Sequence, residues 1–503
     1  MIKAVKMVSF NTIPSDIRVP LFYAEMDNSA ANTAQTNGPA LLFGHVLAGT
    51  SIKPNTLTLM SSGDLAGSLA GRGSQLARMV AAYRKVDPFG ELWAIAVPEP
   101  AGAAAKATLT VTGTATASGT VALYIGNVLV QAAVANGDDA AAVAASITSA
   151  ITAGLELPVT AAAAEGVITL SARHKGLTGN DIPLTLNYRG AAGGEVLPAG
   201  INVALVPMAG GTGSPDLSGA IAAMGDELAD YIGLPFNDAA SIAAIAMEMN
   251  DSTGRWSYAR QLYGHAYSVK FGDLSSLVTF GDALNIQHIT VTGHEETSQT
   301  AADELTALHT ARNAVFIRID PARPTQTGEL NGALPPVPGQ RFILPEQQSL
   351  LSHGIATAYT ENGVVRVQRA ITTYQKNAYG VKDNSYLDSE TLHTSAYVLR
   401  RLKSVITSKY GRHKLANDGT RFGPGQAIVT PAVIRGELCA TYLQMEREGI
   451  VENAELFKKY LIVERNATNP SRLDVLFPPD YVNQLRVFAL LNQFRLQYNE
   501  ETA

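Results

Sequence analysis

The sequence predicts a multidomain protein of α/β and α+β class. An α/β sandwich domain is interrupted by a small α+β insertion and followed by a C-terminal α+β core, with a β arm at each terminus. Three observations support this prediction: strands and helices alternate along the chain, the composition changes abruptly at Pro98–Pro100, and apolar residues alternate near both ends. The length of 503 residues corresponds to roughly three domains.

The first segment, residues 1–30, is predicted to be an extended N-terminal arm. Its apolar residues recur at every second position: Ile17, Val19, Leu21 and Tyr23. This period of two is typical of a β-strand. Pro20 cannot donate a hydrogen bond to a sheet ladder, so the strand is expected at the edge of a sheet.

The α/β domain is predicted to be discontinuous and to comprise residues 31–100 and 206–345. Its first part contains a strand, a helix and a second strand, and the helix is marked by apolar residues at i, i+3, i+4 and i+7: Leu76, Met79, Val80 and Tyr83. Ser74 is expected to cap this helix, and anion binding by Arg72 is the alternative role for the same turn. Units of this kind form parallel sheets with right-handed crossovers.

Residues 101–205 are predicted to form a compact α+β insertion domain. Between residues 101 and 164 the charged residues are only Lys106, Asp138, Asp139 and Glu156, whereas Ala, Thr, Val and Gly dominate. We expect several strands, a hairpin turn at Gly126-Asn127 and a helix that begins near Asp138. Exposed loops tolerate the insertion of a whole domain.

The C-terminal core is predicted over residues 346–484, with a long helix at Ser389–Ser408, and a second arm over residues 485–503. One side of this arm carries Phe488, Leu490, Phe494, Leu496 and Tyr498. An isolated terminal strand has unpaired backbone groups that can pair with another chain. The pattern leaves two alternatives open: the arms pair within their own subunit, or they pair with neighbouring subunits.

The charge balance excludes some classes of function. The chain has 38 Lys and Arg against 44 Asp and Glu, a net charge of −6, so non-specific nucleic-acid binding is not expected. Charged residues make up 16%, against about 25% in average soluble domains, which suggests that other molecules cover part of the surface. The single cysteine, Cys439, excludes an intrachain disulfide, and we expect neither a signal peptide nor a membrane-spanning helix.

No residue pattern indicates a catalytic, cofactor-binding or metal site. Gly210–Ser214 follows a predicted strand, as phosphate-binding turns do, but it lacks the lysine of a phosphate loop, and Asp216 would repel a phosphate. We interpret it as a tight turn, and an α/β enzyme that binds a phosphorylated ligand there is the alternative function. The segment 294–296 begins like a zinc-binding helix, but Ser298 stands where the second histidine is required, so we interpret it as a polar loop.

Several segments, in their order along the chain, resemble the tail sheath proteins of contractile-tailed bacteriophages, most closely the Mu-like branch. They are Ser9–Tyr23 (SFNTIPSDIRVPLFY), Gly71–Arg84 (GRGSQLARMVAAYR), Gly210–Ser214 (GGTGS), Val365–Thr373 (VRVQRAITT) with the helix that follows it, and Leu485–Tyr498 (LRVFALLNQFRLQY). The resemblance spans nearly the whole chain and is weakest over residues 101–205.

This resemblance implies a homo-oligomer of stacked hexameric rings around a tail tube protein, with baseplate and tail terminator proteins as further partners. The sheath would contract to drive the tube through the host envelope without consuming a nucleotide. The subunit would assemble in the host cytoplasm and become part of the virion, without binding nucleic acid or inserting into a membrane. The insertion would face outward, and both arms would link subunits through a small shared sheet. A surface adhesin built on the insertion is a further alternative, although the sequence has no recognisable export signal.

Overall fold

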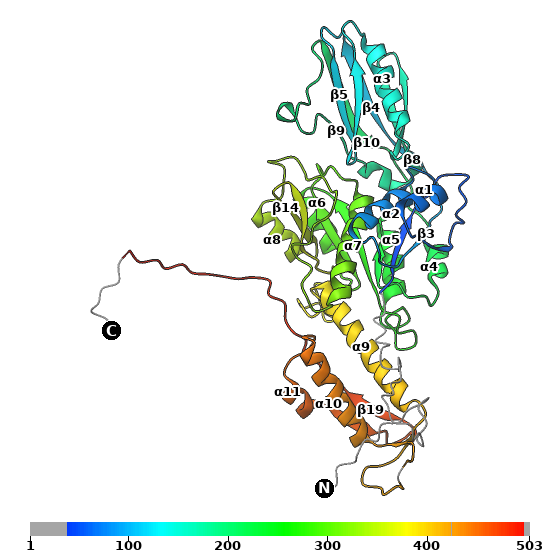
Figure 1. Cartoon of the computed structure of the whole chain (residues 1–503), viewed down its shortest axis with the longest axis vertical. Helices are drawn as coiled ribbons and strands as arrows, with labels where there is room; N and C mark the ends of the chain where they lie inside the picture. The colour runs from blue at the N-terminus through cyan, green and yellow to red at the C-terminus, as the bar shows by residue number, and fades with distance from the viewer. Residues whose placement is uncertain (1–37, 424, 497–503) are drawn as a thin grey trace, which may run out of the picture. The chain divides into compact units, whose positions relative to one another are not determined.

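The largest element of the structure is an eight-stranded mixed sheet (Figure 1). The computed structural model describes residues 38–423 and 425–496. In spatial order the strands are β15 (Val364–Arg369), β14 (Ala356–Glu361), β13 (Ile289–His294), β12 (His265–Phe271), β11 (Tyr231–Gly233), β1 (Ala40–Gly44), β3 (Leu92–Ala96) and β2 (Leu57–Leu59). Neighbouring strands from β14 to β3 are parallel, whereas the outermost strand at each edge is antiparallel to its neighbour. The predicted α/β architecture with a parallel sheet is therefore confirmed.

Helices cover both faces of this sheet. They are α1 (Gly63–Ala70), α2 (Gln75–Val86), α4 (Ser218–Met224), α5 (Ala239–Met249), α6 (Leu274–Asp282), α7 (Ala302–Ile319) and α8 (Leu344–Ser352). Leu42 of β1 packs in a cluster with α2 and α7, whereas Leu41 and Phe43 pack in a second cluster with α4 and α5. Burial on both faces explains why β1 is apolar throughout. The predicted cap of α2 is also present, because the backbone N–H of Ala77 donates to Ser74 Oγ at 3.2 Å.

The insertion between β3 and α4 has two antiparallel sheets and its own hydrophobic core. Its elements are β4 (Ala104–Gly113), β5 (Gly119–Ile125), β6 (Val128–Val134), α3 (Ala140–Ala153), β7 (Val159–Ala164), β8 (Val167–Lys175), β9 (Leu184–Leu186) and β10 (Ile201–Ala209), with two short 3₁₀ helices at Leu177–Asp181 and Ala191–Gly193. The strand orders are β10-β4-β8-β7 and β6-β5-β9. The chain enters and leaves through adjacent segments, since Thr212 N donates to Ala103 O at 3.1 Å and Ala103 N donates to Thr212 Oγ1 at 3.0 Å.

The C-terminal region is built around two long helices. Its elements are α9 (Ser389–Tyr410), β16 (Lys414–Leu415), β17 (Ile428–Val429), α10 (Pro431–Arg447), α11 (Ala454–Tyr460), β18 (Ile462–Arg465) and β19 (Leu473–Leu476). Its core includes Tyr442, whose ring stacks on that of Phe457 with the centroids 3.8 Å apart. Arg400 of α9 donates to Asp230 Oδ2 at 2.6 Å and joins this helix to the amino end of β11. Among the described residues, no helix is long and apolar enough to cross a bilayer.

Candidate assembly interface

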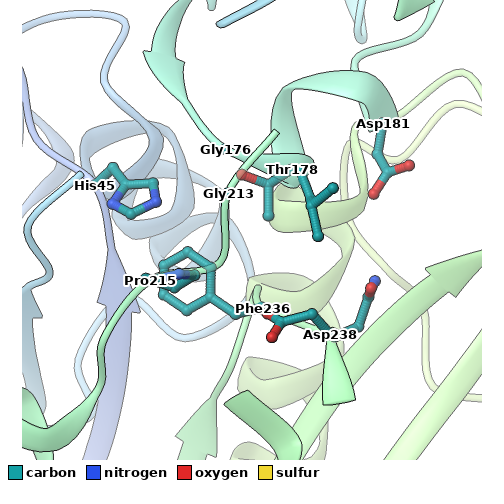
Figure 2. A pocket seen from close by; sticks show the side chains of 10 residues that line it. His45, Gly176, Thr178, Asp181, Gly213, Pro215, Phe236 and Asp238 are labelled. Carbon is teal, nitrogen blue, oxygen red and sulfur yellow. The ribbon is translucent and has the colours of Figure 1, made fainter. Parts of the chain in front are cut away.

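The glycine-rich segment at Gly210–Ser214 borders a cavity that is too small for a phosphorylated ligand. Figure 2 shows this cavity of about 10 Å³, with His45, Asp181 and Asp238 among the residues that line it. Such a volume corresponds to about one water molecule. Burial raises the pKa of Asp181 to about 6, so this carboxyl is mostly ionised at neutral pH and would repel an anion. The cavity gives no support to the alternative of a phosphorylated ligand.

The glycines of this segment are required by close backbone contacts. Gly213 has a φ of 102°, and a Cβ at this position would lie 2.2 Å from the carbonyl oxygen of Ala101. A Cβ on Gly211 would lie 2.5 Å from the carbonyl oxygen of Gly176. At Gly213 such a contact is combined with a positive φ, and only glycine fits this combination. The structure has neither a turn nor a bend at residues 210–217, so the tight turn is not observed; the glycines instead allow close backbone approach to Ala101 and Gly176.

The prediction that His294 lies in a polar loop is wrong. His294 is the last residue of β13 and is 2% exposed, so it belongs to the buried central sheet and not to a loop. Its Nε2 lies 2.9 Å from Nε2 of His309 on α7. Burial lowers the pKa of His294 to about 4, so the pair is neutral at pH 7 and serves packing. Within the described ranges, no group of three or more His, Cys, Asp or Glu residues could hold a metal ion.

The C-terminal arm is the most exposed apolar segment that the sequence analysis singled out. Residues 477–496 form neither helix nor strand apart from one bridge between Tyr481 and Val451 (red in Figure 1). The predicted arm residues that the structure describes are highly exposed: Phe488 79%, Leu490 76%, Phe494 76% and Leu496 95%. Tyr498 and the N-terminal set, Ile17, Val19, Leu21 and Tyr23, lie outside the described residues. Contiguous exposed apolar surface of this kind marks an interaction site.

A two-stranded antiparallel sheet, β18–β19, directly precedes the arm in the chain. One face packs against α10 and α11, since Val463 and Leu473 join the cluster of Tyr442 and Phe457. On the other face Ile462 lies opposite Leu476, and these side chains are 49% and 57% exposed. Within the part of the chain that the structure describes, this sheet has no third strand. Two strands alone are marginally stable and leave both edges open to a further strand.

The sequence analysis did not identify this sheet, although the sequence contains a signal for it. Two short runs that contain β-branched or aliphatic residues, Ile462–Arg465 and Leu473–Leu476, flank residues 466–472, which contain Asn, Pro and Ser. Short strand-forming runs around such a turn are typical of a β-hairpin, although the apolar and charged residues do not alternate regularly here. Each run is only four residues long, so the signal is weak.

The arm and the open sheet are complementary surfaces on one chain. The arm offers an extended backbone with apolar side chains, and the sheet offers open edges beside the exposed pair of Ile462 and Leu476, whose face also carries Glu464 and Asp474. When two different surfaces of identical subunits meet, the contact is heterologous and generates rings or helical filaments. This arrangement can therefore link subunits, and it performs no chemistry.

Comparisons with known proteins agree over most of the chain. Three family models match: the phage tail sheath protein beta-sandwich domain at residues 100–202, the phage tail sheath protein central domain at 210–373 and the phage tail sheath C-terminal domain at 381–495. A Mu-like prophage FluMu tail sheath protein of Haemophilus influenzae is 40% identical over 498 residues, which cover 97% of this chain and 100% of that protein.

Solved structures of two sheath proteins are also similar to this chain. The sheath tail protein of Desulfitobacterium hafniense has 12% identity and a TM-score of 0.49, and the match covers 93% of this chain and 97% of that one. The sheath tail protein of Listeria innocua has 10% identity and a TM-score of 0.47, with coverage of 88% and 92%.

Proposed function

The chain belongs to the Mu-like family of phage tail sheath proteins, and from this premise we propose that it polymerises as stacked hexameric rings around the tail tube and contracts to drive the tube through the host envelope. Proteins of this family are structural, non-enzymatic components of the virion tail. The partners in this proposal are further copies of the chain, the tail tube protein, and the baseplate and tail terminator proteins.

The observation that carries the proposal is the exposed C-terminal arm. Its apolar side chains at Phe488, Leu490, Phe494 and Leu496 are at least 76% exposed, although apolar side chains normally gain free energy by leaving water. We infer that the arm of one subunit adds a strand to the β18–β19 sheet of a neighbouring subunit. This is β-augmentation, in which backbone hydrogen bonds provide affinity and alternate side chains provide specificity.

The strength of such a junction suits a contracting polymer. About six ladder hydrogen bonds, each worth about 0.5–1.5 kcal/mol net, would contribute about 3–9 kcal/mol per junction. Burial of the arm's apolar side chains would add to this value. A junction formed by an extended arm can persist while the folded bodies of two subunits rotate against each other. Subunits could therefore change their packing without separating.

The N-terminal arm is part of the same proposal. Ile17, Val19, Leu21 and Tyr23 would form a further strand of the shared sheet, because their alternation gives one apolar and one more polar side. Together the two arms would bind each subunit to more than one neighbour.

Truncation tests the proposal directly. The full-length chain should form long hollow tubes in negative-stain electron microscopy, whereas a chain that ends at Leu485 should remain a folded monomer. A chain that ends at Leu496 is the matched control and should polymerise, since it retains the exposed apolar residues. The proposal fails if the full-length chain stays monomeric at high concentration, or if the chain ending at Leu485 polymerises normally.

A mixing experiment tests the acceptor sheet. Ile462→Lys and Leu476→Lys together remove the exposed apolar pair of β18–β19 while leaving the arm intact. Neither this variant nor the chain ending at Leu485 should polymerise alone. An equimolar mixture should form a heterodimer, because one chain supplies an arm and the other supplies an intact sheet. If the mixture stays monomeric in analytical ultracentrifugation, the β18–β19 sheet is not the acceptor.

A further inference from the structure

We propose that Arg486 is the fixed root of the C-terminal arm: a positioning residue that ties the arm to the start of α9 and, through it, to the central sheet. This inference rests on the proposed function of the arm. It adds the point at which the arm leaves the folded body and the elements to which it is attached.

Arg486 differs from its neighbours in exposure. The flanking side chains of Leu485 and Val487 are 70% and 79% exposed, whereas the side chain of Arg486 is 11% exposed. The guanidinium group reaches into the body and is held by two carboxylates and two amides, one of which is the side chain of Gln484, whose Oε1 accepts from Nη2. Its Nη2 lies 3.1 Å from Asp388 Oδ1 and 3.1 Å from Glu390 Oε1, and its Nη1 donates to Gln326 Oε1 at 3.3 Å.

The backbone at this point is held as well. Gln326 Nε2 donates to the carbonyl oxygen of Leu485 at 3.2 Å, so one glutamine side chain binds both the Arg486 side chain and the backbone before it. Gln484 Nε2 donates to the carbonyl oxygen of Ala322 at 3.3 Å. The arm root is therefore attached to the segment that connects α7 with α8.

The two carboxylates connect Arg486 to other parts of the fold. Asp388 directly precedes α9, and its carboxylate, which makes no capping hydrogen bond to that helix, accepts two hydrogen bonds from Arg369 of β15, at 2.8 and 2.9 Å. Glu390, in the first turn of α9, is fully buried and accepts from the backbone N–H and the hydroxyl of Thr325, both at 2.9 Å. Arg486 thus joins the arm to α9, to the central sheet and to the segment after α7.

Electrostatics explains why this attachment is firm. A buried carboxylate is costly unless a cation or hydrogen-bond donors compensate it. Glu390 has neutral donors from Thr325, and Arg486 is the cation at this carboxylate. Withdrawal of Arg486 would leave a buried charge without its cation, so a pull on the arm would be transmitted to α9 and β15 before the root opened.

The attachment also fixes the reach of the arm. The preceding backbone contact to the body is the hydrogen bond from Val482 N to Ile450 O at 3.2 Å. Loss of the contacts made by Gln484, Leu485 and Arg486 together would free residues 483–486 and lengthen the arm by about 13 Å, at about 3.3 Å per residue. A strand that is displaced by even one residue presents the opposite set of side chains. Arg486 would therefore determine which arm residues meet the neighbouring sheet.

Trypsin provides a test that does not depend on assembly, because it cleaves after arginine. Below the polymerisation threshold, the wild-type chain should release the peptide that begins at Val487 slowly, since the Arg486 side chain is held in the body. The double variant Gln326→Ala/Asp388→Asn keeps the cleavage site, the buried Glu390 pair and an acceptor for Arg369. It should release that peptide at least about tenfold faster, because a local opening now breaks fewer contacts.

Assembly provides the second test. Arg486→Gln leaves every apolar residue of the arm in place, and it should raise the critical concentration at least about tenfold or give tubes without a regular repeat. The matched control is Arg401→Gln, which also removes an arginine paired with a carboxylate, Glu448 at 3.7 Å, but away from the arm root. This control should polymerise like the wild type. If Arg486→Gln fails to fold, the double variant, which keeps Glu390 paired, replaces it.

The outcomes separate this inference from the proposed function. If the chain ending at Leu485 polymerises, the proposed function of the arm is refuted, and this inference, which rests on it, is refuted as well. If that truncation blocks assembly while both root variants form wild-type tubes and show wild-type cleavage after Arg486, only the role of Arg486 is refuted.

Discussion

Replacement of Phe488 and Phe494 by serine should weaken assembly without changing the fold. Both rings lie on the arm, and they are 79% and 76% exposed in the subunit. They therefore contribute little to the stability of the folded body. In the proposed polymer they become buried against a neighbouring subunit, so their loss should appear in the association free energy alone.

The exposures set the size of the effect. Burial of one phenylalanine side chain is worth about 1.5–3 kcal/mol relative to full exposure. About three-quarters of each ring remains available for burial on assembly, so the two rings together contribute about 2–5 kcal/mol per junction. At about 1.4 kcal/mol per factor of ten, the critical concentration should rise about 30- to 4,000-fold.

Sedimentation and light scattering across a concentration series measure this critical concentration, and thermal melts followed by circular dichroism verify the fold. The control is Phe89→Ser, which makes the same chemical change at a ring that is 96% exposed in the turn after α2. The reasoning is refuted if the double variant polymerises at the wild-type concentration. It is also refuted if Phe89→Ser has an equal effect, because the loss would then reflect general surface hydrophobicity.

Three further predictions concern the folded body. Burial lowers the pKa of His174 to about 3 and those of His294 and His393 to about 4, whereas unfolded histidines titrate near 6.5. The unfolded chain therefore binds protons on these histidines more readily than the folded chain does. The stability of the fold should be unaffected by them above about pH 7 and should fall as the pH drops from about 6.5 towards 4. Melting temperatures that stay constant over this range would contradict the prediction. Arg78→Met should cost about 3–5 kcal/mol in denaturant unfolding, because it leaves the buried carboxylates of Asp303 and Glu304 without their cation. Adding Asp303→Asn and Glu304→Gln should recover part of that loss, and no recovery would show that packing alone is responsible. Gly213→Ala should destabilise the chain by about 1–3 kcal/mol, since its Cβ would collide with Ala101 O at a φ of 102°. A rise in the melting temperature of the wild-type chain on addition of phosphate would favour the alternative in which Gly210–Ser214 binds a phosphorylated ligand.

Elements whose patterns are local could be predicted from the sequence. The helix expected at Ser389–Ser408 is observed at Ser389–Tyr410, and the cap at Ser74 is observed with its hydrogen bond. The end of α4 at Met224 is set instead by one residue, because Gly225 adopts a φ of 46° that leaves the helical region. Element types follow from periodicity over ten or more residues, whereas their ends depend on single backbone torsions.

Contacts between distant residues could not be predicted in this way. His294 lies beside His309 only because β13 and α7 pack together. In the sequence these two histidines are 15 residues apart and do not have the spacing of metal ligands. Arg486 reaches Glu390 across 96 positions of the chain, which no periodicity encodes. The arm itself was identifiable because its side chains alternate, but its root depends on one arginine among apolar residues.

The attachment of the insertion has a consequence for the evolution of this protein. The polypeptide leaves the host domain at Ala103 and returns at Thr212, and these two residues are joined by a pair of hydrogen bonds. The inserted domain has a separate hydrophobic core, so substitutions within that core leave the hydrophobic cluster of the central sheet unchanged. Selection can therefore act on the two cores separately, provided that a diverging insertion keeps the geometry of the two junction residues.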